Sequence, residues 1–210
     1  MNWARISPAA RAVLPVIAVH CDEQGRSFPG EEAIAALSGR TPKTVRQGIR
    51  NLAGFPGFDW EYYLTRRGKR GKRFTLKLPP KGEKGRCFFF YRAIFDGGNW
   101  AQLTPAAQSV YPVLRYFSYF DRNEVEEPGE SFDDDYLGRE WELCGALQSE
   151  VSKYAGLSRH ALPKAMDSLK KNFLVEPHDG GNGEHLWKVF IIPPSHWKRA
   201  YLNSQLGNSG

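Results

Sequence analysis

Apolar side chains recur at helical spacing near the start of the chain. Ala9, Val13 and Ile17 fall on one face of a helix with 3.6 residues per turn. Ser7 and Pro8 precede them, and a hydroxyl cap followed by proline at the first helical position is typical of a helix start. The pattern therefore predicts a helix that begins directly after Ser7.

Two more helices follow the same logic. Residues 30–38 begin with acidic side chains, which favour a helix N-terminus, and end before Gly39. Residues 42–52 follow Thr41, and Val45, Ile49 and Leu52 form the apolar face of this third helix.

A β-hairpin is predicted after the third helix. A break rich in glycine and proline at residues 54–57 is followed by strand-like runs at 60–65 and 73–78. Three helices followed by a two-stranded hairpin is the element order of a winged helix, with the hairpin as the wing.

Parts of this sequence pattern occur a second time later in the chain. Residues 2–16 and 99–113 are identical at nine of fifteen positions, which indicates an internal duplication. Residues 33–41 match residues 150–158 more weakly, and each copy ends on an apolar run followed by two prolines. The two matched segments of this second pair lie further apart in the sequence than those of the first pair. The second copy is therefore predicted to contain an insertion.

The segments 27–35, 39–45 and 49–52 carry the most specific pattern: phenylalanine-proline-glycine, a helix, then glycine, threonine, lysine and threonine-valine. This pattern resembles the helix-turn-helix, or winged-helix, modules of bacterial phage and plasmid regulatory and replication-initiation proteins. The resemblance covers roughly residues 4–80 and implies a DNA-binding fold.

The expected fold class is therefore α+β, with two tandem winged-helix domains of three helices and a hairpin each. The expected divisions are a DNA-binding domain, a linker, a second winged-helix domain with an acidic insertion at 124–147, and a tail: residues 1–80, 81–86, 87–202 and 203–210.

The third helix would act as the recognition helix, since in a helix-turn-helix this element lies in the major groove. When its apolar face is buried, five polar side chains point outward: Lys43, Thr44, Arg46, Gln47 and Arg50. Arginine can bind guanine through two hydrogen bonds, glutamine can bind adenine, and the threonine methyl can contact thymine. The alternative is an ordinary solvated helix face.

Charge is distributed unequally. Residues 1–97 hold 18 Lys and Arg against 8 Asp and Glu, whereas residues 98–210 hold 11 against 15. Six basic residues crowd into the hairpin tip at 66–73: Arg66, Arg67, Lys69, Arg70, Lys72 and Arg73. We expect them to contact phosphates or the minor groove, unless the segment is a flexible linker. Arg11 is a further candidate for a flanking phosphate contact.

The second copy lacks this charge. Arg159, His160 and Lys164 could still contact DNA, but Pro163 is expected about five residues inside the third helix, where it would distort it. The glycine-rich segment 176–185 is expected to be a hairpin turn, because it lacks the lysine and threonine of a phosphate-binding loop.

Two further segments carry expectations. The insertion 124–147 holds nine acidic residues and is either a solvated loop or a docking surface for a protein partner, ending in a short helix that contains Trp141 and Leu143. Residues 87–95 are apolar enough to be a buried strand that leads into the second copy.

These patterns predict a non-enzymatic protein that binds specific sites on double-stranded DNA, as a transcription regulator or a replication initiator of a mobile element. The second domain would provide homodimerisation, a second half-site or a partner surface. Two unlike modules in one monomer favour an asymmetric or directly repeated site over a strict palindrome, unless the protein dimerises. An adaptor whose acidic half binds a partner is the alternative.

A nucleic-acid-processing enzyme is less favoured, since no paired metal carboxylates or phosphate-binding loop occur. No cofactor or metal is expected, because the five histidines and three cysteines lack ligand spacing. Short apolar runs and the absence of a signal-peptide pattern favour a cytoplasmic location with no membrane partner. The resemblance to phage and plasmid modules implies that the cell is bacterial.

Overall fold

The structure is a computed structural model of the 210-residue chain, and it describes residues 3–77, 90–119, 141–180 and 185–193. The expected linker at 81–86, the tail at 203–210 and the first seventeen residues of the expected insertion lie outside the described residues. Below, residues 3–77 are called the N-terminal part and the described residues from 90 onward the C-terminal part.

The N-terminal part has the predicted order of elements. Its helices and strands are η1 (Trp3–Arg5), α1 (Pro8–Ala18), β1 (Arg26–Ser27), α2 (Glu31–Ser38), α3 (Pro42–Leu52), β2 (Phe58–Leu64) and β3 (Arg70–Leu76). The start of α1 after Ser7 and the bounds of α2 and α3 confirm the predictions from helical spacing. The hairpin strands begin two or three residues earlier than predicted.

Caps account for the sharp helix starts. The Ser7 hydroxyl accepts a hydrogen bond from the Ala10 N–H at 3.3 Å, and the Thr41 hydroxyl accepts one from the Thr44 N–H at 3.2 Å. In each case proline occupies the first helical position, where its missing N–H removes no intrahelical bond. At the other end of α2, Gly39 adopts a left-handed conformation with φ of 65° and ends the helix.

The C-terminal part repeats the order of three helices followed by a hairpin. Its elements are α4 (Ala93–Asp96), α5 (Asn99–Gln102), α6 (Pro105–Phe117), β4 (Ser118–Tyr119), β5 (Trp141–Cys144), α7 (Gln148–Ala155), α8 (Ala161–Lys171), β6 (Val175–Asp179) and β7 (His185–Phe190).

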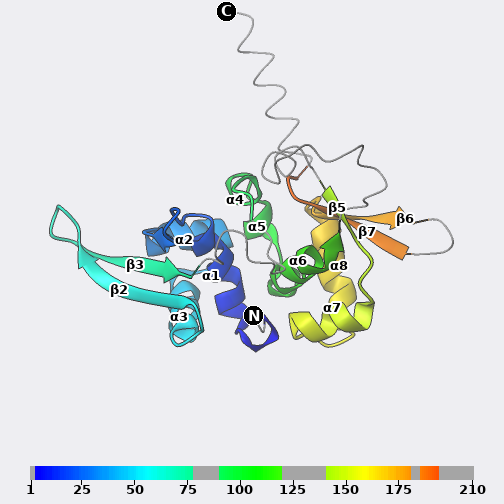
Figure 1. The fold of residues 1–210 in the computed structure, drawn as a ribbon, viewed down its shortest axis with the longest axis horizontal. Coiled ribbons are helices and arrows are strands. Elements are labelled where there is room, and N and C mark those ends of the chain that lie inside the picture. The colour runs from blue at the N-terminus through cyan, green and yellow to red at the C-terminus, as the bar shows by residue number, and fades with distance from the viewer. Residues whose placement is uncertain (1–2, 78–89, 120–140, 181–184, 194–210) are drawn as a thin grey trace, which may run out of the picture.

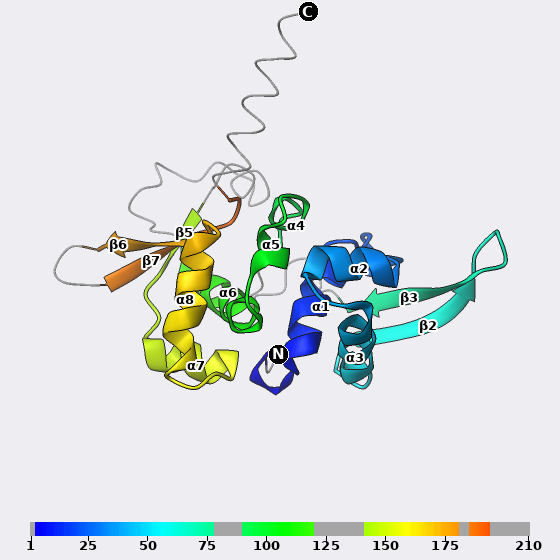
Figure 2. The ribbon, with the colours of Figure 1, turned by 180° about the vertical axis from the view of Figure 1, so that it is seen from behind.

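Two antiparallel sheets flank the helices. The strand order is β1-β3-β2 in the N-terminal sheet and β4-β5-β7-β6 in the C-terminal sheet. Figure 1 shows the β2–β3 hairpin and the β6–β7 hairpin projecting in opposite directions, with α1 and α6 between them, and Figure 2 shows the same arrangement from behind.

Three expectations for the C-terminal part are wrong. Pro163 does not distort the third helix, because α8 begins at Ala161 and the proline lies in its first turn, where no intrahelical N–H bond is lost. Residues 141–144 form strand β5 instead of a helix, since they pair with β7. In the apolar segment 87–95, residues 93–95 belong to helix α4.

The glycine-rich segment 176–185 is also shorter as a turn than predicted. Residues 176–179 belong to β6, whose Asp179 pairs with His185 at the start of β7. The prediction of a hairpin is confirmed, but its strands extend further towards the tip.

A single cluster of buried apolar side chains runs through both parts. In the N-terminal part it includes Val45, Ile49 and Leu52 of α3, which are at most 1% exposed, as the helical pattern predicts. In the C-terminal part, Trp100 and Tyr111 are fully buried. Because α1 packs directly against α6, the two parts share this core rather than forming separate ones.

Candidate nucleic-acid interface

The outer face of α3 carries all five predicted base-contacting residues. Lys43, Arg46, Gln47 and Arg50 are exposed, and Thr44 is partly exposed. The opposite face is held against α1 at very close range. A Cβ at Gly48 would lie 2.8 Å from the carbonyl oxygen of Ala9, so only glycine permits this approach. The close contact fixes the orientation of the polar face.

An acidic residue outside the set predicted from the sequence connects α3 to the hairpin. Glu31, at the start of α2, accepts a hydrogen bond from Arg46 at 3.1 Å through one carboxylate oxygen and from Lys72 through the other. Glu31 therefore positions one predicted base-contacting side chain and one predicted phosphate-contacting side chain together.

The electrostatics of Glu31 follow from these contacts. Partial burial by itself would raise the pKa of Glu31, but the hydrogen bonds and charges of Lys72 and Arg46 outweigh it, and the pKa is lowered. The carboxylate is therefore ionised at neutral pH. It neutralises part of the positive charge at the junction of α3 and the hairpin.

A second group of side-chain hydrogen bonds runs along α3. The Gln47 side-chain amide donates to Asn51 Oδ1 at 2.8 Å, and Asn51 Nδ2 donates to the Ser7 hydroxyl at 2.7 Å. Asn51 is not among the residues predicted from the sequence, although its position one turn after Gln47 places it on the same face. These hydrogen bonds connect this face of α3 to the N-terminus of α1.

Strand alternation divides the basic segment of the hairpin. Arg70 and Lys72 are two residues apart on β3 and lie on one face, whereas Arg73 lies on the other and forms an ion pair with Glu61. Arg66, Arg67 and Lys69 are in the connecting turn, where Gly68 has a φ of 70°. The six basic residues thus form three groups instead of one patch.

Aromatic rings lie beneath Arg70 and Lys72. The Arg70 guanidinium carbon lies 4.3 Å from the centroid of the Tyr62 ring, and the Lys72 Nζ lies 5.2 Å from that of Trp60. Tyr62 and Trp60 pack edge to face, with centroids 5.2 Å apart. These cation–π contacts hold the two cations on the face of the hairpin from which Lys72 reaches Glu31.

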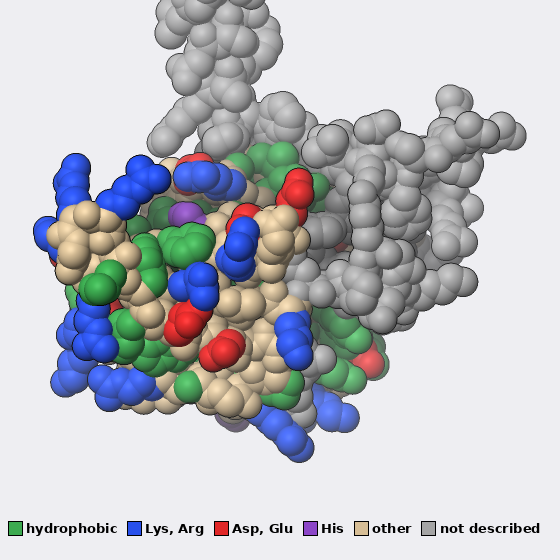
Figure 3. Space-filling model, turned by 60° about the vertical axis from the view of Figure 1, so that its left-hand side comes forward, with side chains coloured by type: hydrophobic (Ala, Val, Ile, Leu, Met, Phe, Trp, Pro, Cys, Tyr) green, Lys and Arg blue, Asp and Glu red, His purple; other side chains and the backbone are tan. Residues whose placement is uncertain are grey.

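Four of the six basic residues have no ion-pair partner within the described part of the chain: Arg66, Arg67, Lys69 and Arg70. All four are exposed. Figure 3, in which the N-terminal part is turned forward, shows Lys and Arg side chains along the left edge of this face, with only a few Asp and Glu side chains among them. An anionic partner would neutralise the four unpaired charges.

The second predicted set lies at the start of α8. Arg159, His160 and Lys164 are all exposed, so the structure leaves them accessible. The charge around them differs from that of α3, because Asp167 is on the same helix and pairs with Lys170 at 3.5 Å.

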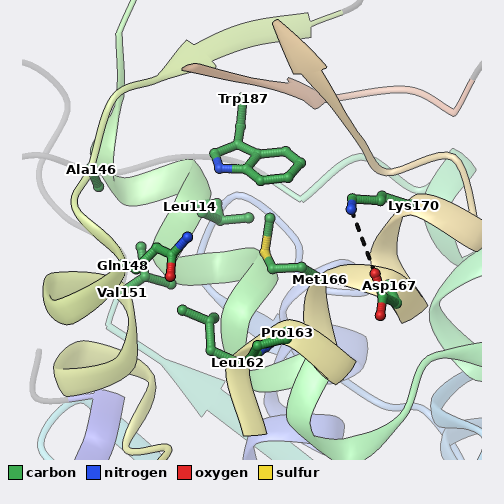
Figure 4. A pocket seen from close by; sticks show the side chains of 10 residues that line it. All are labelled: Leu114, Ala146, Gln148, Val151, Leu162, Pro163, Met166, Asp167, Lys170 and Trp187. Atoms are coloured by element: carbon green, nitrogen blue, oxygen red, sulfur yellow. Dashed lines mark ion pairs between the residues drawn. The ribbon is translucent and has the colours of Figure 1, made fainter. Parts of the chain in front are cut away.

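A cavity of about 170 Å³ opens beside α8 in the C-terminal part. Figure 4 shows Met166 and Trp187 facing its interior and the Asp167–Lys170 pair at one side. In the aligned copies, Gln148 and Pro163 of the cavity wall stand where the N-terminal part has Glu31 and Arg46. The ionic cluster of the first part is therefore replaced by a largely apolar hollow in the second.

One predicted phosphate contact is wrong. Arg11 is only 4% exposed, and its guanidinium donates to the carbonyl oxygens of Ile6 at 2.7 Å, of Ala4 at 2.8 Å and of Ala155. Burial lowers the pKa of Arg11. This arginine connects the two parts of the protein and does not face solvent.

Among the described residues, no three His, Cys, Asp or Glu side chains are grouped so that they could hold a metal ion. In the same part of the chain, no helix has the length and apolar character needed to cross a membrane.

Comparison with known proteins gives one match. No curated protein and no solved structure matches the chain. Residues 4–55, which include α1, α2 and α3, match a family model described as a helix-turn-helix domain. The N-terminal part therefore contains a helix-turn-helix module, the kind of module through which proteins bind DNA.

Proposed function

We propose that the protein is a non-enzymatic, site-specific double-stranded DNA-binding protein, with α3 in the major groove and the β2–β3 hairpin acting as a wing on the phosphates or the minor groove. The observation that carries this proposal is the joint placement of α3 and the wing. Glu31 holds Arg46 of α3 and Lys72 of the wing on one continuous surface.

The division of labour on this surface follows from the contacts. Arg46, Gln47 and Arg50 extend from a helix fixed by its packing on α1, which suits them to hydrogen-bond base edges. Lys43 and Thr44 lie at its N-terminal end, which is the end that approaches the bases in a helix-turn-helix. The unpaired cations of the wing turn suit phosphate contacts, which add affinity without sequence preference.

The domain plan that supports this function has a DNA-binding unit at 1–80 and a second winged-helix unit at 87–202. The repeated order of helices and hairpin supports it. In this plan the second unit supplies a second half-site. A transcription regulator and a replication initiator of a mobile element both need only site recognition and assembly.

Selection of bound sequences from a random DNA library by the purified full chain tests the proposal. We expect a defined sequence motif to be enriched, and we expect Arg46→Ala to relax it at one or two positions. Equal affinity for all recovered and unselected sequences would contradict site-specific binding.

A second candidate function is that of an adaptor that binds a protein partner through the acidic segment 124–147. Its support is the unequal charge of the two halves, since residues 98–210 carry more acidic than basic side chains. Deleting residues 124–140 distinguishes the adaptor function from the DNA-binding function. Unchanged DNA binding with lost activity in cells would favour the adaptor.

A further inference from the structure

The contacts between the two parts come in matched pairs. Trp3 Nε1 donates to the carbonyl oxygen of Ser109 at 2.8 Å, and Trp100 Nε1 donates to that of Ala12 at 3.1 Å. Trp3 and Trp100 are equivalent in the repeated segments 2–16 and 99–113, and so are Ala12 and Ser109. Exchanging the two copies therefore turns one hydrogen bond into the other.

A second pair obeys the same exchange. Arg11 donates to the carbonyl oxygen of Ala155, and the Gln108 side-chain amide donates to that of Ser38 at 2.9 Å. Arg11 and Gln108 are equivalent in the first repeat, while Ser38 and Ala155 are equivalent in the second. The residues differ in type, but each donates from its long helix to the end of the other copy's shorter helix.

The glycines that end these shorter helices form a third pair. Gly39 and Gly156 both have left-handed backbones, with φ of 65° and 62°. A Cβ at Gly39 would overlap the carbonyl oxygen of Ala101, and one at Gly156 would lie 3.1 Å from that of Ala4. Ala4 and Ala101 are again equivalent positions.

Whole elements repeat the pattern. Helix α1 packs on its counterpart α6, α2 packs on α5, and α7 packs on η1. Figures 1 and 2 show the consequence: α2 and α7 lie on opposite sides of the α1–α6 contact, as do the two hairpins. Contacts in which i meets j and j meets i define an isologous interface, which a two-fold axis produces and a simple translation does not.

From this exchange we propose that the chain is a covalently joined pseudo-dimer whose DNA target contains two half-sites in inverted orientation, one for α3 and one for α8. The proposal rests on the DNA-binding function proposed above. Rotation about a two-fold axis does not change a direction that is parallel to the axis. A surface of α3 that faces along the axis is therefore matched by a surface of α8 that faces the same way. Tandem modules related by translation would instead require a direct repeat.

The two half-sites are unequal. The buried residues Val45 and Ile49 of α3 correspond to Leu162 and Met166 of α8, which are also buried, so the two helices align in register. In that register Pro163 takes the place of Arg46, and Asp167 takes the place of Arg50.

Helix α8 therefore lacks both arginines that can bind guanine through two hydrogen bonds, and Asp167 repels phosphate. The exposed cations on and just before α8 include Arg159, Lys164 and Lys171, which are suited to the DNA backbone. We therefore expect one strongly specified half-site and, about one helical turn away, a second region bound chiefly through phosphates.

Transplanting the recognition face of α3 onto α8 tests the orientation. The variant carries five substitutions at exposed or partly exposed positions: His160→Lys, Ala161→Thr, Pro163→Arg, Lys164→Gln and Asp167→Arg. Selection from a random library should then recover the half-site of the unmodified chain twice, as an inverted repeat. A direct repeat, or a single half-site from a folded variant, would overturn the proposal.

A matched control separates sequence recognition from charge. His160→Arg with Asp167→Lys adds the same positive charge to α8 without the residue pattern of α3. This control should bind more tightly but select the same sequence as the unmodified chain. A second half-site selected by the control would show that charge alone explains the result, and would overturn the proposal.

Footprinting of the unmodified chain provides an independent measurement if the five-fold variant fails to fold. Protection of the backbone in two regions about one helical turn apart on one face of the duplex is expected, and protection of one region only would overturn the proposed pair of half-sites. A chain that enriches no sequence at all would refute the proposed function itself, so the two failures are distinguishable.

Discussion

The wing offers the sharpest quantitative prediction. Arg66, Arg67, Lys69 and Arg70 are exposed and have no ion-pair partner among the described residues, whereas Lys72 and Arg73 already pair with carboxylates. Changing the four unpaired residues to glutamine should remove phosphate contacts without breaking an ion pair.

The magnitude follows from counterion release. Each phosphate that is neutralised contributes about 0.9 to the slope of log affinity against log salt concentration. If the four cations each contact a phosphate, the slope should become shallower by about 3 to 4. Between roughly 50 and 200 mM salt, the unmodified chain should then lose about a hundred-fold more affinity than the variant.

The assay is fluorescence anisotropy with a labelled duplex at several salt concentrations, using both the selected site and a scrambled one. Affinity should fall on both duplexes, because phosphate contacts carry no sequence information. The matched control is Arg26→Gln with Arg92→Gln, two exposed arginines that pair with acidic residues at 3.0 and 3.2 Å. It should leave the slope nearly unchanged.

Two results would refute this reasoning. A slope that changes by less than about 1 would mean that the wing does not contact phosphates. A loss confined to the selected duplex would mean that the wing contacts bases, contrary to its assignment as a backbone contact.

Three further predictions concern single residues. Glu31→Gln should reduce stability at neutral pH. Because the folded-state pKa of Glu31 is lowered, its stabilisation is present above its unfolded value of about 4.3 and is lost as pH falls through the folded value. Denaturant titrations of both proteins should therefore converge in acid, and a gap that does not change with pH would contradict the ion-pair cluster. Gly48→Ala should cost about 1–3 kcal/mol in the free energy of unfolding, because its Cβ would press on the Ala9 carbonyl, and an unchanged melting temperature would contradict that close contact. Glu142→Gln should cost about 3–5 kcal/mol in thermal or chemical unfolding, because Glu142 forms a buried ion pair at 3.1 Å with Arg115; a cost below about 1 kcal/mol would contradict the importance of this pair.

The sequence predicts the helices of the N-terminal part because their signals are local. Caps at Ser7 and Thr41, prolines after them and Gly39 at the end of α2 each act within a few residues. The buried face of α3 follows from the same periodicity. Such signals require no knowledge of distant contacts.

The predictions from sequence fail where contacts between residues far apart in the chain determine the local structure. Residues 141–144 become a strand because β7 pairs with them, and that partner lies more than 40 residues away in the chain. Pro163 is harmless because α8 begins at Ala161, so the proline lies in its first turn and not about five residues inside the helix. Glu31 joins the candidate interface because the fold brings both Arg46 of α3 and Lys72 of the hairpin to its carboxylate, from 15 and 41 residues away in the sequence.

Arg11 shows most clearly how the two parts depend on each other. Sequence alone gives a cation on a helix of a basic module, which suggests contact with DNA. In the structure its guanidinium is surrounded by carbonyl oxygens, two from its own part and one, of Ala155, from the other. A buried charge that loses a hydrogen-bond partner is costly, so separating the parts would leave this group unsatisfied.

The position of α3 therefore depends on the C-terminal part. Helix α1 packs against α3 on one side and α6 on the other, and it carries Arg11 into the contact with α7. Any change that loosens the C-terminal part should disturb α1 and thereby the surface from which Arg46 and Gln47 extend. The C-terminal part has Pro163 and Asp167 where α3 has Arg46 and Arg50, yet it keeps the contacts that hold α1, and through it α3, in place.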